Sequence, residues 1–174
     1  MKVERDEATL RPITNDDLPL YEELLVDPAT MAELGGPISR DGLAEKLRGI
    51  VEDVEARRTW YFVILPDDEA EPAGTVCVWS HDWNGQEISE IGWMVLPRFQ
   101  GRGLATRAVR TVLRRAGGEA RWDVIHAFPA VTNAPSNAIC RKTGFSLVGQ
   151  ADIDYAGRVL RCNHWRVDVR PTAG

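Results

Sequence analysis

The sequence predicts an α+β protein in which about four helices pack on one mixed sheet of six to seven strands. Segments with strand and helix periodicity follow each other as strand, two helices, three strands, helix, strand, helix and two strands. Asn84-Gly85 is the strongest hairpin signal, so the strands on either side of it should be antiparallel neighbours. A turn containing Gly101 and Gly103 then joins an apolar strand to an amphipathic helix, which adds a strand-turn-helix unit.

The first third of the chain predicts one strand and two helices. The strand covers residues 8–12 and ends at Pro12, and Thr14 or Asn15 then caps a helix that reaches Leu25. Residues 28–36 are predicted as a loop or a broken helix. A second helix should run from Ser39 or Asp41 to about residue 57, because its apolar residues recur on one face.

The remaining elements are delimited by turn residues. An acidic turn at 66–72 separates the first two central strands, and Pro97 ends the third because proline cannot donate to a strand ladder. Gly144 is a natural left-handed cap for a short helix. The predicted ranges are strands 60–65, 74–81, 87–96 and 122–128, a helix from 104, a helix over 136–143, and a closing hairpin of 145–154 and 158–169.

Length and composition indicate one soluble domain over residues 1–174, with an ordered core at about 8–170 and looser ends at 1–7 and 171–174. The 21 basic and 26 acidic residues give a net charge of −5, which argues against non-specific nucleic-acid binding. No segment predicts a signal peptide or a membrane span. Cys77, Cys140 and Cys162 lack metal-ligand spacing and are predicted to be reduced thiols of a cytoplasmic protein without a metal.

The turn at residues 98–103 predicts an anion-binding site. A glycine-rich turn that opens a helix leaves backbone N–H groups unpaired at the positive end of the helix dipole. Arg98 and Arg102 add formal positive charge. Two other phosphate motifs fit less well, because no Gly-Lys-Ser/Thr triplet occurs and Thr106 stands where a dinucleotide fingerprint needs a third glycine. Glycines alone would also be compatible with a plain strand-to-helix connection.

The residues Arg98-Phe-Gln-Gly-Arg-Gly103 fit the Gln/Arg-x-x-Gly-x-Gly/Ala signature of the GNAT superfamily of acetyltransferases. The order of predicted elements resembles the GNAT fold over nearly the whole chain. The resemblance implies acetyl-CoA as cosubstrate, with its pyrophosphate in this turn. The residues that it assigns to acetyl-CoA are Met94, Val95, Arg98, Gln100, Gly101, Arg102, Gly103, Leu104, Ala105, Asn133, Ser136 and Asn137.

A second signature runs from Asn133 to Phe145. It resembles the Asn-x-x-Ser…Gly-Phe block of GNAT enzymes, especially the branch that acetylates N-terminal amines of ribosomal proteins. The resemblance implies that Asn133 contacts the pantetheine arm and that Ser136 lies near the thioester sulfur. Singly, Asn133 could also be a turn or helix-cap residue, and Ser136 a hydrogen-bond donor in the first turn of a helix. Cys140 stands where many relatives carry a tyrosine acid, so Ser136 is the better candidate to hydrogen-bond the departing sulfur, and Cys140 is predicted to be a buried core residue.

Acetyl transfer to an amine requires a base, because an alkylammonium has no lone pair. Glu90 is the predicted base, since it shares one face of its strand with Gly92 and Met94, where partial desolvation raises a carboxyl pKa. Its alternative role is a structural partner for an arginine or a backbone group. His126 on the next strand is the rival base. The family places the oxyanion donor at a backbone N–H of the strand before the loop, here Met94 or Val95.

The prediction is therefore an acetyl-CoA-dependent N-acetyltransferase that moves an acetyl group to a primary amine, on a peptide N-terminus or a small molecule, through a tetrahedral intermediate. The alternative is a non-catalytic sensor of CoA or acyl-CoA with the same fold. No nucleic-acid or membrane partner is expected, and the protein should be a monomer or homodimer. The candidate acceptor residues are Trp79, Trp83, Trp93, His81, Asp82, Glu87 and the loop at 34–37.

Overall fold

The computed structural model describes residues 6–170 and contains one seven-stranded mixed sheet. The strands lie in the order β1-β2-β3-β4-β5-β7-β6. The predicted tail at 171–174 and the first five residues lie outside the described part of the chain. The strands are β1 Thr9–Pro12, β2 Trp60–Leu65, β3 Gly74–Trp83, β4 Gln86–Val95, β5 Val124–Ala127, β6 Ser146–Tyr155 and β7 Arg158–Asp168.

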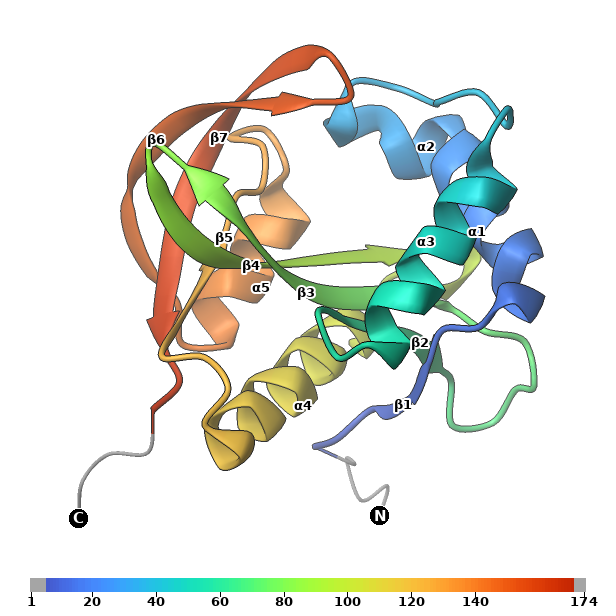
Figure 1. Cartoon of the computed structure of the whole chain (residues 1–174), viewed down its shortest axis with the longest axis horizontal. Coiled ribbons are helices and arrows are strands. Elements are labelled where there is room, and N and C mark those ends of the chain that lie inside the picture. Colours follow the sequence, from blue (N-terminus) through green and yellow to red (C-terminus); the bar gives the residue numbers. More distant parts are fainter. Residues whose placement is uncertain (1–5, 171–174) are drawn as a thin grey trace.

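Five α-helices accompany the sheet (Figure 1). They are α1 Leu18–Val26, α2 Pro28–Met31, α3 Leu43–Glu55, α4 Leu104–Glu119 and α5 Ala134–Lys142. The predicted broken helix is therefore α2, which continues as a short 3₁₀ turn over Ala32–Leu34. The helix predicted from Ser39 or Asp41 begins later, at Leu43, because Gly42 adopts a left-handed conformation with φ of 79° immediately before it.

The two helical layers cover opposite faces of the sheet, with α1, α2 and α3 on one side and α4 and α5 on the other (Figure 1). Side-chain alternation in β4 separates these faces. Ile91 is buried on the α4 side, whereas Glu90 belongs to the side of α1. Burial of an aliphatic side chain contributes about 1.5–3 kcal/mol, so the apolar α4 face supplies much of the stability that holds β4 in place.

The β3–β4 hairpin closes through Asn84 and Gly85, as predicted. Both residues have positive φ, 52° and 77°, which is the type I′ geometry that a two-residue hairpin favours. This turn fixes the register, so Trp83 pairs with Gln86 and Trp79 lies opposite Glu90.

The parallel strands β4 and β5 share a single residue pair, Glu90 opposite His126. Beyond that pair β4 continues to Val95, whereas β5 ends at Ala127. The sheet is therefore unpaired between the carboxyl ends of these two strands. Ligands of open α/β sheets bind at the carboxyl ends of parallel strands, so this break in the pairing is the natural place for a site.

Candidate active site

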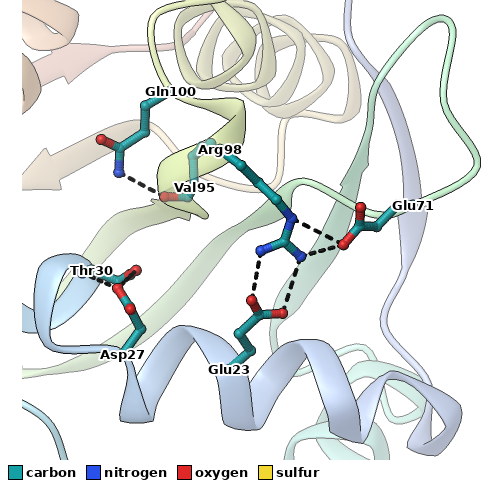
Figure 2. A network of polar contacts seen from close by, with 7 residues as sticks. All are labelled: Glu23, Asp27, Thr30, Glu71, Val95, Arg98 and Gln100. Atoms are coloured by element: carbon teal, nitrogen blue, oxygen red, sulfur yellow. Dashed lines mark hydrogen bonds and ion pairs between the residues drawn. The ribbon is translucent and has the colours of Figure 1, made fainter.

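The glycine turn connects β4 to α4 at the edge of this break. Gly101 and Gly103 have φ values of 75° and 73°, and a Cβ atom added to either would meet nothing within 4 Å. The glycines are therefore needed for the left-handed backbone, and the turn faces open space. Gln100 Nε2 donates to Val95 O at 2.9 Å and ties the turn to the end of β4 (Figure 2). The first N–H groups of α4 lack partners within the helix.

The arginines of the turn are paired with acidic side chains. Arg98 contacts both Glu23 of α1 and Glu71, as Figure 2 shows. Arg102 is paired with Glu69, which belongs to the same acidic turn as Glu71. The carboxylates of Glu23 and Glu71 raise the pKa of Arg98, so its charge is fixed. A phosphate contact by Arg98 or Arg102 stays a prediction and would require exchange of these surface ion pairs.

Glu90 lies on β4 with its side chain only 16% exposed. Burial raises the pKa of this carboxyl, and the hydrogen bond and charge of the neighbouring His81 partly oppose the shift. His81 Nε2 lies 2.7 Å from Glu90 Oε2. The structure therefore places Glu90 in the partly desolvated environment expected for a base, with an imidazole as partner rather than an arginine.

His126 lies directly across from Glu90 on β5, but its ring is engaged elsewhere. Its Nδ1 lies 2.8 Å from Nε2 of His164 on β7. Burial, followed by the charges of His164 and Arg166, lowers the pKa of His126 to about 4. The ring is therefore neutral at physiological pH, and it is a much weaker proton acceptor than an ordinary histidine.

The second predicted motif forms the start of α5. Asn133 is its N-cap and accepts a hydrogen bond from Ser136 N at 3.1 Å. Asn137 is buried, and its amide donates to Ala130 O and Asn133 O while accepting from Asn163 and Trp165. Asn137 thus ties α5 to β7. Contacts of these residues with acetyl-CoA stay predictions.

Cys140 lies in the middle of α5 and is 0% exposed, as expected for a core residue. Burial raises the pKa of its thiol to about 12. A thiol of this kind neither ionises near neutral pH nor reaches solvent. Ser136, one turn earlier on α5, is partly exposed.

The backbone of β4 distinguishes the two candidates for the oxyanion donor. Leu96 N donates to Ala73 O, which continues β3, and a Cβ atom on Gly74 would lie 2.0 Å from Met94 O. Met94 therefore directs its backbone toward β3. Backbone N–H and C=O groups point alternately to the two sides of a strand, so those of Val95 point toward the β5 side. There the Val95 oxygen accepts a hydrogen bond from Gln100.

The face that carries Glu90 also carries three of the predicted acceptor residues, Trp79, His81 and Trp83. Asp82 and Glu87 pair with each other and point to the other face. Trp79 stacks near His81, and Trp83 contacts the rings of Phe128 and His164. Trp93 lies on the opposite face, where it packs against the core beside Val76. The structure therefore places Trp79 opposite Glu90, sets Trp83 further along the same face, and leaves Trp93 on the other face.

The predicted loop at 34–37 borders a groove on the same side of the molecule. The groove has a volume of about 240 Å³. A hydrogen bond of 2.6 Å from Thr132 Oγ1 to Glu33 Oε2 spans it. The lining residues are Ala32, Glu33, Gly35, Ala130, Val131, Thr132, Val159, Leu160 and Arg161.

The contact between His81 and Glu90 was not predicted from the sequence. The signal for it is the two-residue turn, which makes Trp79 the partner of Glu90 and hence places His81 diagonally across from Glu90 on one face. The His126–His164 contact carries no such local signal, because β7 follows β5 only after α5 and β6.

Over residues 6–170, no helix is long and apolar enough to cross a membrane. In the same range, no three His, Cys, Asp or Glu side chains gather in a way that would hold a metal ion.

A family model described as an acetyltransferase (GNAT) domain matches residues 7–146 of the chain. No curated protein matches the sequence at a significant level. Solved structures with the same fold include the ribosomal-protein-S5-alanine acetyltransferase of Vibrio fischeri, which is 19% identical with a TM-score of 0.77 over 93% of both chains.

Two further structures contain coenzyme A. The ribosomal L7/L12 alpha-N-protein acetyltransferase RimL is 17% identical, with a TM-score of 0.76 over 93% of this chain and 94% of that one. The aminoglycoside acetyltransferase AAC(6′)-Ib, in complex with ribostamycin and coenzyme A, is 20% identical, with a TM-score of 0.75 over 93% of both chains. At these identities the likeness shows a shared fold.

Proposed function

Because the chain belongs to the GNAT family of acetyltransferases, we propose that it transfers the acetyl group of acetyl-CoA to a primary amine by direct attack. The observation that carries the proposal is the position of Glu90. This partly desolvated carboxylate lies where the pairing of β4 and β5 ends, and the glycine turn connects the end of β4 to the start of α4. A diphosphate fits that turn. The two glycines leave room for an anion, and the unpaired N–H groups and the positive end of α4 attract it.

Each step of the transfer has a candidate residue. Glu90 removes a proton from the ammonium, so that the neutral amine can attack the thioester carbonyl. The N–H of Val95 donates to the oxyanion of the tetrahedral intermediate, which is stabilised by donors already in place. The Ser136 hydroxyl donates a hydrogen bond to the sulfur as the carbon–sulfur bond breaks. The thiolate of CoA then leaves without a strong acid, because the Cys140 thiol is buried. The second proton that the amine nitrogen loses goes to this thiolate, so CoA is released as a thiol.

We expect an α-amine or a small primary amine as acceptor rather than an internal lysine. An α-amine has a pKa of about 7.7–8.0, so a useful fraction is neutral at pH 7.5, whereas a lysine amine at about 10.4 is almost wholly charged. A carboxylate base with a moderately raised pKa suits the easier deprotonation. RimL is an alpha-N-protein acetyltransferase, and AAC(6′)-Ib binds the aminoglycoside ribostamycin, so both acceptor classes occur among proteins with this fold.

A non-catalytic sensor of CoA or acyl-CoA is the second candidate. It is favoured by Cys140, which stands at the position of the usual tyrosine acid and is buried. A sensor would bind acetyl-CoA as an enzyme does but would release no free thiol with any amine.

Two measurements test the proposal. In a thermal shift assay, acetyl-CoA and CoA should raise the melting temperature, whereas NAD and ATP should not, since only a ligand that binds the native state stabilises it. Thiol release should then be followed with N-terminal peptides, polyamines, amino acids and aminoglycosides. Turnover confined to lysine peptides with blocked N-termini would refute the acceptor class. Binding of acetyl-CoA without any turnover would favour the sensor.

A further inference from the structure

His81 and Glu90 form a two-residue unit on the face of the sheet where acetyl transfer is proposed. His81 Nε2 lies 2.7 Å from Glu90 Oε2, and His81 Nδ1 lies 3.1 Å from the backbone oxygen of Asp82. The His81 side chain is 32% exposed, whereas the Glu90 side chain is 16% exposed. The imidazole therefore connects the more buried carboxylate to solvent.

The contact with Asp82 identifies the tautomer of His81. A carbonyl oxygen can only accept a hydrogen bond, so the ring atom that faces it, Nδ1, carries the proton. A neutral imidazole has one ring proton, and Nε2 therefore presents a lone pair to Glu90. The other tautomer would set the lone pair of Nδ1 against that of the carbonyl oxygen.

Two lone pairs that face each other at 2.7 Å repel unless a proton lies between them. The pair is consequently built to hold one extra proton, either on the Glu90 carboxyl or on Nε2 of His81. A single carboxylate would have to release each proton to water itself. The pair instead offers a second acceptor, and that acceptor lies nearer to the solvent.

We propose that His81 is a positioning residue that receives, through Glu90, the proton released by the acceptor amine and passes it to water. This inference rests on the proposed acetyl transfer. An N–H bond of the ammonium breaks as an O–H bond forms on Glu90. The O–H bond then breaks as an N–H bond forms on Nε2 of His81, which leaves a carboxylate beside an imidazolium. Nε2 finally releases this proton to solvent as its N–H bond breaks, and the pair returns to its starting state, a Glu90 carboxylate beside a neutral His81 that keeps its proton on Nδ1.

The other titratable groups around this pair are two thiols, two histidines, the exposed Asp82 and the charged Arg166 beside the histidines. Burial raises the thiol pKa of Cys77 on β3 to about 12 and that of Cys162 on β7 to about 11. His126 on β5 has a pKa lowered to about 4, and that of His164 on β7 is also lowered, mainly by burial. Asp82 beside His81 is exposed and accepts from Gly85 N. The acidic limb of catalysis is therefore expected to depend on Glu90 and its partner His81.

The test compares His81→Gln with His164→Gln. Glutamine at 81 can still donate a hydrogen bond to Glu90, but it cannot accept the proton. We expect kcat with an active amine to fall roughly 10-fold to 100-fold, with little change in the acetyl-CoA KM. The acidic limb of the kcat profile should change its position, because a single carboxyl, whose pKa burial raises, takes the place of the pair. His164→Gln should leave that limb in place. An unchanged limb in folded His81→Gln would overturn the inference.

A second readout does not depend on activity. In ¹⁵N NMR spectra of the wild-type protein above the titration of the pair, the His81 ring should carry its proton on Nδ1, and Glu90→Gln should change the Nε2 signal of His81. A ring protonated on Nε2 would already donate to Glu90 and would refute the inference. If the wild type acetylates no amine, the proposed function fails, whereas the NMR result still decides the tautomer.

Discussion

Arg98 and Glu23 form a two-point ion pair across 75 residues of sequence, with Nη1 2.6 Å from Oε1 and Nη2 3.2 Å from Oε2. The pair ties α1 to the turn that follows β4 (Figure 2). Both side chains are more than 40% exposed, so the pair adds little to stability. The two carboxylates compete with a ligand for Arg98, because a phosphate that binds Arg98 must displace Glu23 or Glu71.

Neutralising this competing charge should strengthen CoA binding. In Glu71→Gln the guanidinium of Arg98 loses one of its two carboxylate partners. We expect the CoA affinity to rise by about twofold to fivefold at low salt, and the gain should shrink as salt screens the charges. Titration calorimetry measures it. Asp152→Asn is the matched control, since it breaks a comparable exposed pair with Arg161 on the distant β6–β7 hairpin. A lower CoA affinity in Glu71→Gln would contradict the prediction.

Gly103→Glu should weaken CoA binding by tenfold or more, about 1.4 kcal/mol. The substitution places a negative charge at the N-terminus of α4, where the phosphate is expected. Gly103 has a φ of 73°, so any side chain there also adds backbone strain. Gly103→Gln separates the two effects, because it carries the same strain without the charge. Equal CoA affinities for folded Gly103→Glu and Gly103→Gln would show that no phosphate binds there.

Glu90→Gln keeps the shape of the side chain and removes the proton acceptor. We expect kcat to fall roughly 10²-fold to 10⁴-fold while acetyl-CoA affinity barely moves. His126→Gln should lose far less activity, since the low pKa of His126 makes it a weak base. Steady-state kinetics across pH compares the two variants. If His126→Gln loses the acidic limb and Glu90→Gln stays active, the two roles must be exchanged.

Acidification should destabilise the protein through His126. Its folded-state pKa of about 4 lies below the unfolded value of about 6.5, so the unfolded chain binds more protons between these two values. The stabilisation is complete above about pH 6.5 and is lost as the pH falls toward 4. The melting temperature of the wild type should decline through this window, and His126→Gln should flatten the decline. An equally steep decline in the variant would assign the effect to other groups, of which His164 is the first to test.

Asn137→Ala should lower the free energy of unfolding by about 2–4 kcal/mol. The change leaves the buried Trp165 Nε1 and the Asn163 amide without their acceptor and removes two donations from α5 to nearby carbonyl groups. Urea denaturation measures the loss. Asn163→Ala is a suitable comparison, because it removes only one of these bonds. Full stability in Asn137→Ala, combined with weaker CoA binding, would mean that Asn137 serves the ligand instead.

The sequence by itself determined the order of the elements and the sites of their turns. Asn84-Gly85 specified a two-residue hairpin, and Gly144 adopts the positive φ, 92°, of a left-handed cap. Gly101 and Gly103 marked the strand-to-helix turn. These features depend on backbone angles and on the spacing of apolar residues. Both are determined by residues that are close together in the sequence. Glu90 was also found this way, because alternation along one strand is a local property.

Only the tertiary structure decided the partners of the site residues. Arg98 was predicted to face a phosphate, and it lies between Glu23 and Glu71, which come from two other segments. His126 was predicted as a possible base from the ordinary pKa of histidine, but burial and His164 lower its pKa in the folded protein. Pairings of this kind join segments that are distant along the chain, and the pKa of a side chain depends on the desolvation and charge that such packing creates. Neither quantity can be read from local sequence, because both arise only when the sheet and its helices come together.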